Sequence, residues 1–298
     1  MFRDPDGIDY QTRFVVTSRD ELSPGVPRTP RLTCKTCSKA SSLLTTEQRN
    51  ARIIAALRAA NPHVKNFSHD EGLPTKPVGH QDGIRTSTRI LRSYRNSHRR
   101  GSQFVEPGEV IEVLRDAGIE DFMLMGLYGY VGYMPQPRAT QDVDILISSA
   151  SVETGIRAIS KRWPQLQVQR TEVVIRFRDP GEVSIDGEMK QVIDLMLPSD
   201  ACYQAILKSH RRIDAATGHP IPTIEAACVS KFSAMISPFR LFVRKQQDAI
   251  DLRNLLKTNV GQINEDKLRD IAELTYPGGG DEILDYLRLA LDDKPFPV

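Results

Sequence analysis

The sequence lacks the marks of several protein classes. It has four cysteines and one tryptophan among 298 residues. Its longest apolar stretch, 122–134, is too short and too rich in glycine to span a bilayer. The first residues, Met1 to Asp6, hold no apolar signal core. We therefore expect a cytoplasmic protein with no membrane partner.

The few cysteines argue against a disulfide framework. Cys34 and Cys37 form a lone Cys-x-x-Cys pair, and no second pair follows at the spacing of a zinc ribbon. Cys202 and Cys228 lie far away in apolar contexts. In a chain of this size an even count does not imply disulfides, so we expect reduced thiols and disfavour zinc.

Positive charge is concentrated in the first third of the chain. Residues 1–104 hold 18 Lys and Arg against 9 Asp and Glu, which leaves 22 against 29 for residues 105–298. The first part also lacks sustained apolar periodicity and is rich in Ser, Thr, Arg and Pro. We therefore expect a low-order basic extension over 1–104, a core domain over 105–215 and a helical region over 216–298.

Two stretches of this extension show a pattern. Ile53, Ile54 and Leu57 recur at helical spacing behind a candidate cap at Thr45, which predicts a short helix. Six arginines lie in the range 85–100, a run that fits a nucleic-acid footprint. The alternatives are a solvated basic tail and an over-extended gene start.

Two aspartates stand at the centre of the segment 138–147. From Gln141 to Ile147 the pattern first alternates and then becomes apolar, which predicts a strand that is exposed at its start and buried at its end. Side chains two apart on a strand share a face, so Asp142 and Asp144 are expected side by side. Two such carboxylates repel unless a cation lies between them, and Mg²⁺ prefers oxygen ligands. The alternative is a chance Asp-x-Asp on an exposed strand.

The elements before this strand predict a buried strand followed by a glycine turn. Pro107 suits the first turn of a helix that Gly118 ends. The apolar run 122–125 predicts a buried strand that ends at Gly126. A glycine between a strand and a helix lets backbone N–H groups approach a phosphate, and a simple tight turn is the alternative.

Later segments supply further charged candidates. Asp194 is the one acid in an apolar run, 190–197, that predicts a strand, and a buried carboxylate there needs a metal or an arginine partner. Lys231 lies in a predicted helix. Asp248 and Asp251, three apart, share one face of a second helix. Without further information these helices read as an amphipathic pair with solvated or salt-bridged polar faces.

The spacing of these motifs resembles a known signature. Gly126, fifteen residues, and then Asp142-Val143-Asp144, preceded by Arg138-x-Thr140, are similar to the polymerase-beta-type nucleotidyltransferase superfamily. Downstream, Lys-x-x-Ala from Lys231 and Asp-x-x-Asp from Asp248 resemble the AbiEii-like nucleotidyltransferases of type IV toxin–antitoxin systems. The resemblance covers about half of the chain.

The resemblance implies an α+β fold and a nucleotide site. The fold would be a small mixed sheet flanked by helices, with a helical C-terminal part. The implied metal ligands for two Mg²⁺ ions are Asp142, Asp144 and Asp194, and the implied nucleotide-binding residues are Gly126, Arg138, Thr140, Lys231, Asp248 and Asp251. One departure is Leu127, which stands where the family has a second glycine or a serine.

The function that this resemblance implies is Mg²⁺-dependent transfer of a nucleoside monophosphate from a nucleoside triphosphate (NTP) to a hydroxyl group. The acceptor is a tRNA or other RNA, a protein or a small molecule, and an antitoxin is an expected partner. The alternative is a degenerate nucleotidyltransferase fold that binds a nucleotide, RNA or protein without chemistry. Leu127 and the basic first hundred residues favour this second interpretation.

Overall fold

The computed structural model describes residues 76–98, 104–183 and 187–297, with a few positions between 45 and 59. The chain divides into two compact units, Met1–His69 and Asp70–Val298. In the first unit, Thr45 Oγ1 accepts a hydrogen bond from the Gln48 backbone N at 3.2 Å, ahead of helical positions up to residue 59. The threonine cap is therefore confirmed, whereas Cys34 and Cys37 lie outside the described residues.

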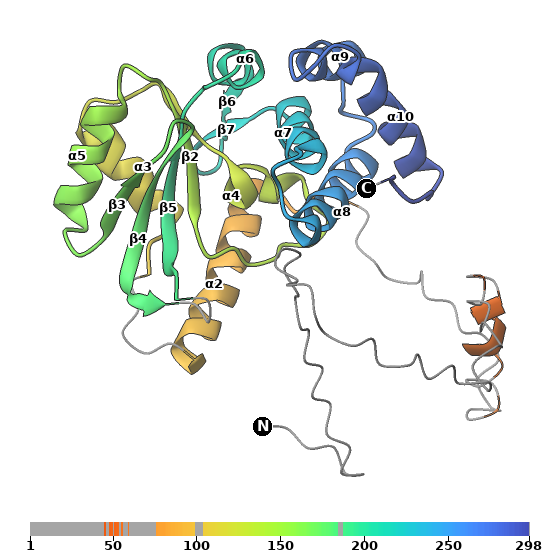
Figure 1. Ribbon diagram of the computed structural model, residues 1–298, viewed down its shortest axis with the longest axis horizontal. Coiled ribbons are helices and arrows are strands. Elements are labelled where there is room, and N and C mark those ends of the chain that lie inside the picture. Colours follow the sequence, from red (N-terminus) through yellow and green to blue (C-terminus); the bar gives the residue numbers. More distant parts are fainter. Residues whose placement is uncertain are drawn as a thin grey trace, which may run out of the picture. The chain divides into compact units, whose positions relative to one another are not determined.

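The second unit contains the elements labelled in Figure 1. In chain order they are α2 (His80–His98), α3 (Pro107–Asp116), β1 (Phe122–Leu124), α4 (Gly126–Tyr130), the 3₁₀ helix η1 (Val131–Tyr133), β2 (Val143–Ile147), α5 (Val152–Arg162), β3 (Gln167–Arg170), β4 (Val174–Val183), β5 (Met189–Met196), α6 (Ala201–Ser209), β6 (Arg211–Ile213), β7 (Pro220–Pro222), α7 (Ile224–Ile236), α8 (Phe242–Thr258), α9 (Glu265–Glu273) and α10 (Gly279–Leu291).

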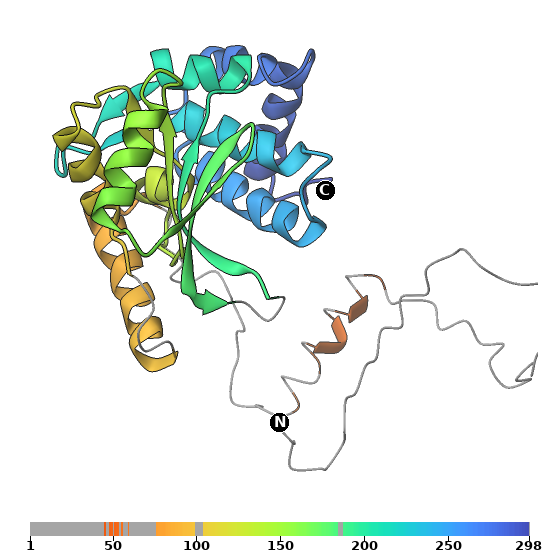
Figure 2. The same ribbon diagram turned by 60° about the vertical axis from the view of Figure 1, so that its left-hand side comes forward.

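The main sheet is mixed. Its strand order is β1-β2-β5-β4-β3, with β6 and β7 forming a separate pair. Strands β2 and β5 run parallel, and the other neighbours in the main sheet are antiparallel. Helices α3 and α5 lie on one side of the sheet and helices α7 to α10 on the other (Figures 1 and 2). This arrangement confirms the α+β fold class with a helical C-terminal part.

Side chains two residues apart on a strand share a face, and this decides which side chains of β2 face the C-terminal helices. Val143 and Ile145 of β2 belong to the core cluster that contains α3 and α5. Leu146 belongs to the other cluster, which joins α4 and η1 to the C-terminal helices. Because side chains two apart share a face, Asp144 lies on the face of Leu146. The acid of β2 therefore points toward the helical side of the sheet.

Helix α2 belongs to the folded unit, although it lies in the stretch that was expected to be a basic extension without a core. Ser87 and Leu91 are buried, and Ser87 Oγ donates a 2.5 Å hydrogen bond to the carbonyl of Arg138. The N–H groups of Val78 and Gly79 bond carbonyls of Met134 and Gly132. The buried stripe of this helix is mostly polar and contains Arg95, so hydrophobic periodicity did not reveal it, and the folded part starts earlier than residue 105.

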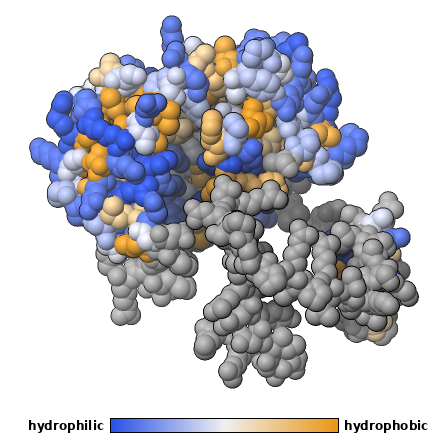
Figure 3. Space-filling model, viewed as in Figure 1, coloured by the Kyte–Doolittle hydropathy of each residue, from blue (hydrophilic) through white to orange (hydrophobic). Residues whose placement is uncertain are grey.

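The surface of this unit is mixed in character. Figure 3 shows a largely hydrophilic face with smaller hydrophobic patches between the charged side chains. Among the described residues, no helix combines the length and the apolar character needed to cross a membrane. Cys202 and Cys228 are both free and buried, as expected for reduced thiols.

Candidate active site

The structure brings the three predicted acids together. Asp144 of β2 and Asp194 of β5 are register partners across the parallel strand pair. Asp142 lies directly before β2, and the Thr140 hydroxyl donates a 2.6 Å hydrogen bond to Asp142 Oδ1. The expected strand from Gln141 was too long at its start, because pairing with β5 begins only at Val143.

Gly126 is the residue that lets Asp144 occupy its position. It opens α4 directly after β1, and its backbone has φ +53°, a left-handed conformation. A Cβ atom at this position would lie 1.8 Å from Asp144 Oδ2. The strand-to-helix junction is therefore confirmed, and the site requires glycine for both backbone and space. The next residue, Leu127, is buried in the apolar core.

Burial and mutual repulsion dominate the electrostatics of the acids. Burial, followed by the charges of Asp142 and Asp194, raises the pKa of Asp144 well above its ordinary value. Burial and the charge of Asp142 raise the pKa of Asp194 to about 6, although Arg176 and Arg178 act in the opposite direction. The carboxylates thus lie close together, and the positive charge around them does not offset the effects of burial and mutual repulsion on their pKa values.

Arg176 is the closest cation to Asp194, and sequence reasoning missed it. It is the register partner of Asp194 on β4, and its Nε lies 3.7 Å from Asp194 Oδ2. That separation is too long for a hydrogen bond. The other oxygen, Asp194 Oδ1, is buried without a hydrogen-bond partner. The salt-bridge alternative for Asp194 is therefore realised at one oxygen only.

The residue types at this site fit a magnesium ion. Mg²⁺ takes oxygen ligands from one or two carboxylates and fills other positions with water and phosphate oxygens. The acids supply such oxygens, and Asp194 Oδ1 has no other partner. As the side chains lie, no group of three His, Cys, Asp or Glu in the described part of the chain is arranged to hold a metal ion. The fit rests on the chemistry of the ligands.

Lys231 joins the two C-terminal acids in a buried ion-pair network. Its Nζ lies 2.8 Å from Asp248 Oδ1 and 3.1 Å from Asp251 Oδ2. Each aspartate is 1 % exposed. The Lys231 amine also lies over the ring of Tyr130. The predicted helix face is confirmed, and it points to Lys231 rather than to solvent.

Three further side chains complete this network. Arg138 Nη2 lies 2.8 Å from Asp251 Oδ2, and the Tyr130 hydroxyl donates a 2.7 Å hydrogen bond to the same oxygen. Arg240 Nε lies 2.5 Å from Asp248 Oδ2. Although burial acts to raise it, Lys231 and Arg138 hold the pKa of Asp251 below its ordinary value. Tyr130 and Arg240 were missed: the contact of Tyr130 spans 121 residues, and that of Arg240 depends on the turn between α7 and α8.

A polar cavity of about 520 Å³ adjoins Asp142. Residues with charged or hydroxyl side chains line it, among them Arg138, Thr140, Asp142, Arg178, Lys190 and Arg244. Arg178 and Lys190 are paired with Glu188 and Glu182 at 2.6 and 2.9 Å. Within the described residues Arg244 forms no ion pair. The cavity therefore presents a cation that is available to an anionic ligand.

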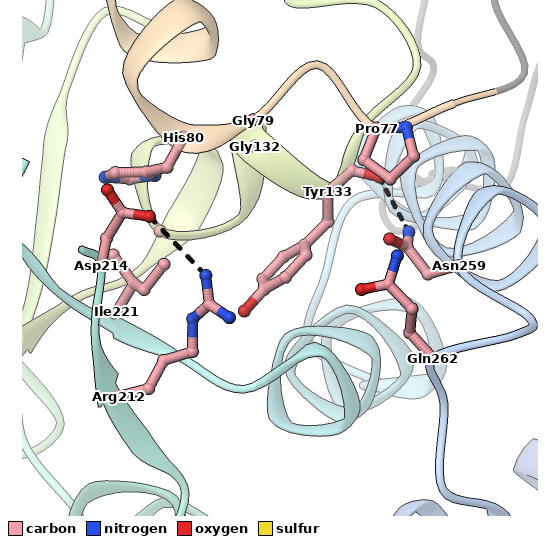
Figure 4. Close-up of a pocket in the computed structure, with 11 residues that line it drawn as sticks. Pro77, Gly79, His80, Gly132, Tyr133, Arg212, Asp214, Ile221, Asn259 and Gln262 are labelled. Carbon is pink, nitrogen blue, oxygen red and sulfur yellow. Dashed lines mark hydrogen bonds and ion pairs between the residues drawn. The ribbon is translucent and has the colours of Figure 1, made fainter. Parts of the chain in front are cut away.

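A smaller cavity of about 210 Å³ lies away from the acids (Figure 4). Figure 4 shows Arg212 and Tyr133 side by side at its centre and His80 beside Asp214. Arg212 is paired with Asp214 at 3.6 Å, and His80 Nε2 lies 3.3 Å from His219 Nδ1. None of the site residues expected from the sequence lines this cavity.

The solved structures to which this chain is similar include two proteins. A nucleotidyltransferase-like antigenic protein from Paracoccidioides brasiliensis is 11 % identical over 73 % of this chain and 95 % of its own, with a TM-score of 0.37. A tRNA-processing enzyme is 12 % identical over 62 % of this chain and 55 % of its own, with a TM-score of 0.27. No family model and no curated protein matches the chain.

Proposed function

We propose that the chain transfers a nucleoside monophosphate from an NTP to a hydroxyl acceptor, which loses its proton as its oxygen bonds the α-phosphorus and pyrophosphate leaves. The observation that carries the proposal is the juxtaposition of Asp144 and Asp194 across β2 and β5, with Asp142 in the lining of a polar cavity. Buried like charges cost stability unless a ligand offsets them. A magnesium–nucleotide complex supplies the missing positive charge and fills such a cavity.

Two Mg²⁺ ions are proposed to be held by Asp142, Asp144 and Asp194. Bound there, they would neutralise phosphate charge and lower the pKa of the attacking hydroxyl. The chain's own contribution is to position groups. Gly126 leaves room for Asp144, and the Thr140 hydroxyl fixes Asp142 Oδ1.

The basic side chains are proposed to offset phosphate charge. Positioning and electrostatics supply most of the catalysis in phosphoryl transfers. The charge of Lys231 acts against the rise in the pKa of Asp144. The same amine also forms ion pairs with Asp248 and Asp251. Arg138 lines the cavity while it pairs with Asp251. Arg244, which lines the cavity and carries no ion pair among the described residues, is the cation with its charge available to a phosphate.

Label transfer tests this proposal. Purified protein is mixed with each α-labelled NTP, Mg²⁺ and cell extract, and label is followed into RNA, protein and small-molecule fractions. The expected result is transfer that the Asp142→Asn/Asp144→Asn variant loses while it keeps the melting temperature of the wild type or exceeds it. Retained transfer in that variant would rule out the metal role of these acids.

A second candidate function is a catalytically degenerate binding module. It is favoured by Arg176, which lies against Asp194 where a metal would bind, and by Leu127 in place of a glycine or serine. In that case calorimetry would detect nucleotide binding, and no extract fraction would gain label. The acceptor class, an antitoxin partner and a cytoplasmic location remain predictions of the sequence.

A further inference from the structure

The loop between α7 and α8 and the first turn of α8 expose an unusual set of apolar side chains. Phe239 is 95 % exposed, Leu241 73 %, Phe242 61 % and Val243 66 %. We call residues 239–245 the α7–α8 loop surface. Several large apolar side chains exposed next to one another mark interaction sites on folded proteins. The segment therefore points to a ligand or partner.

Cations are interleaved with these apolar side chains. Arg240, Arg244 and Lys245 lie within the α7–α8 loop surface, and no Asp or Glu occurs from Ser237 to Gln247. Arg240 is bound to the buried Asp248. Within the described part of the chain, Arg244 and Lys245 form no ion pair, so their charges are available. The surface thus combines aromatic rings with unneutralised positive charge.

This surface is continuous with the candidate active site. Arg244 lines the same cavity as Asp142 and Thr140. Arg240 contacts Asp248, which in turn contacts Lys231. A ligand that lies on Phe239 and Phe242 can therefore extend one end toward the three acids.

We propose that the α7–α8 loop surface binds a single-stranded end of a nucleic acid. Bases would stack on Phe239 and Phe242, and Arg244 and Lys245 would contact phosphates. Sites for single strands combine aromatic platforms with a basic track along the backbone. The proposal names the acceptor class for the proposed function. The role of the nucleic acid as acceptor rests on the proposed transfer activity, whereas its binding to this surface does not.

Binding is tested on the full chain with a fluorescein-labelled single-stranded RNA of mixed sequence, in EDTA, by fluorescence anisotropy. Phe239→Ala/Phe242→Ala is expected to weaken binding at least tenfold and to leave the salt dependence unchanged. The matched control, Val183→Ala/Ile213→Ala, removes exposed apolar side chains from β4 and β6 and is expected to bind as the wild type does.

The cations are tested by salt dependence. Arg244→Gln/Lys245→Gln is expected to lower the slope of log affinity against log salt by about 1.4, which corresponds to two lost phosphate contacts on a single strand. Arg157→Gln/Lys161→Gln on α5 changes the net charge equally and serves as control. An equal change of slope in both variants would mean that only net charge matters, and would overturn the proposal.

Cross-linking separates this surface from the basic residues 1–104. Ultraviolet cross-linking of the wild-type complex followed by mass spectrometry is expected to place nucleotides on Phe239 or Phe242. Cross-links confined to residues 1–104, or unchanged affinity of the Phe239→Ala/Phe242→Ala variant, would overturn the proposal. So would binding of that surface to acidic lipid vesicles or to a second copy of the chain in place of RNA.

Failure of this proposal is distinguishable from failure of the proposed function. The Asp142→Asn/Asp144→Asn variant is expected to bind the RNA at least as tightly as the wild type while transfer is lost. RNA binding without any label transfer would leave this surface established and would reject the enzyme. Label transfer to RNA that is undiminished in the Phe239→Ala/Phe242→Ala variant would reject this surface as the acceptor site.

Discussion

Asp144 and Asp194 are direct neighbours across the parallel pair β2 and β5, on the face of the sheet that looks toward the C-terminal helices. Directly opposed like charges destabilise a sheet. Burial increases this cost, because the low dielectric of the interior strengthens repulsion and disfavours charge. The folded protein therefore carries an electrostatic strain at this point that a bound cation would relieve.

The first prediction concerns that strain. In the absence of divalent ions, Asp144→Asn is expected to raise the free energy of unfolding by about 1 kcal/mol, since it removes one partly buried negative charge. Added Mg²⁺ is expected to raise the melting temperature of the wild type and to leave that of the variant unchanged. Thermal melts with and without Mg²⁺ measure both effects.

Asp121→Asn, an exposed acid before β1, is the control for this experiment and is expected to behave as the wild type does. A destabilised Asp144→Asn variant that still responds to Mg²⁺ would show that the ion binds elsewhere.

The second prediction concerns Gly126. Gly126→Ala is expected to lower the free energy of unfolding by about 3 kcal/mol, because alanine is strained at φ +53° and its Cβ would displace the Asp144 carboxylate. Gly118→Ala is the matched control: Gly118 has φ +75°, but nothing lies within 4 Å of the added Cβ, so only the backbone cost of about 1 kcal/mol applies. Urea denaturation compares the two. Equal losses would mean that the contact with Asp144 does not matter.

The elements that carry the acids could be predicted from the sequence. Strand β5 contains the run from Val192 to Met196, which is apolar except for Asp194 and is typical of a buried strand. Strand β1 ends at Leu124, two residues before Gly126, and the glycine predicted the junction. The alternation of a strand also predicted Asp142 and Asp144 on one face, but Asp142 lies before β2, so strand pairing fixes the place of Asp144 only. The inferences on the two strands depend only on local pattern, which is why they hold.

The partners of the acids could not be predicted in this way. Arg176 reaches Asp194 only through the pairing of β4 with β5, and such pairing depends on the whole fold. Helix α2 was overlooked because its arginines obscure a stripe formed by Ser87, Leu91 and Arg95, all of them buried. Arginine can be buried along an apolar surface, so charge alone does not identify an extension.

The third prediction concerns the buried network around Lys231. Lys231→Met is expected to lower the free energy of unfolding by about 3–5 kcal/mol, because Asp248 and Asp251 would remain buried with one cation fewer. Lys257→Met breaks the exposed pair with Asp293 and is expected to cost at most about 1 kcal/mol. Both changes replace a lysine in an ion pair by the same apolar residue, and urea denaturation measures the difference. Similar small losses would show that Lys231 serves a ligand and not the fold.

The fourth prediction concerns His80, which packs against His219 and lines the smaller cavity with Asp214 and Arg212. Burial lowers the pKa of His80 from 6.5 to about 4, with Asp214 acting in the opposite direction and His219 and Arg212 adding to the decrease. Between these two values the unfolded chain binds a proton that the folded chain does not, so this site loses stability as the pH falls.

His80→Gln is therefore expected to flatten the dependence of unfolding free energy on pH between 6 and 4.5. The slope should decrease by up to about 1.4 kcal/mol per pH unit, the value for one proton. Urea denaturation at four pH values gives the slope. His210→Gln is the control, because His210 is only partly buried and its pKa is also lowered by burial. If both variants flatten the curve equally, the deeper burial of His80 is not what keeps its imidazole neutral in the folded chain.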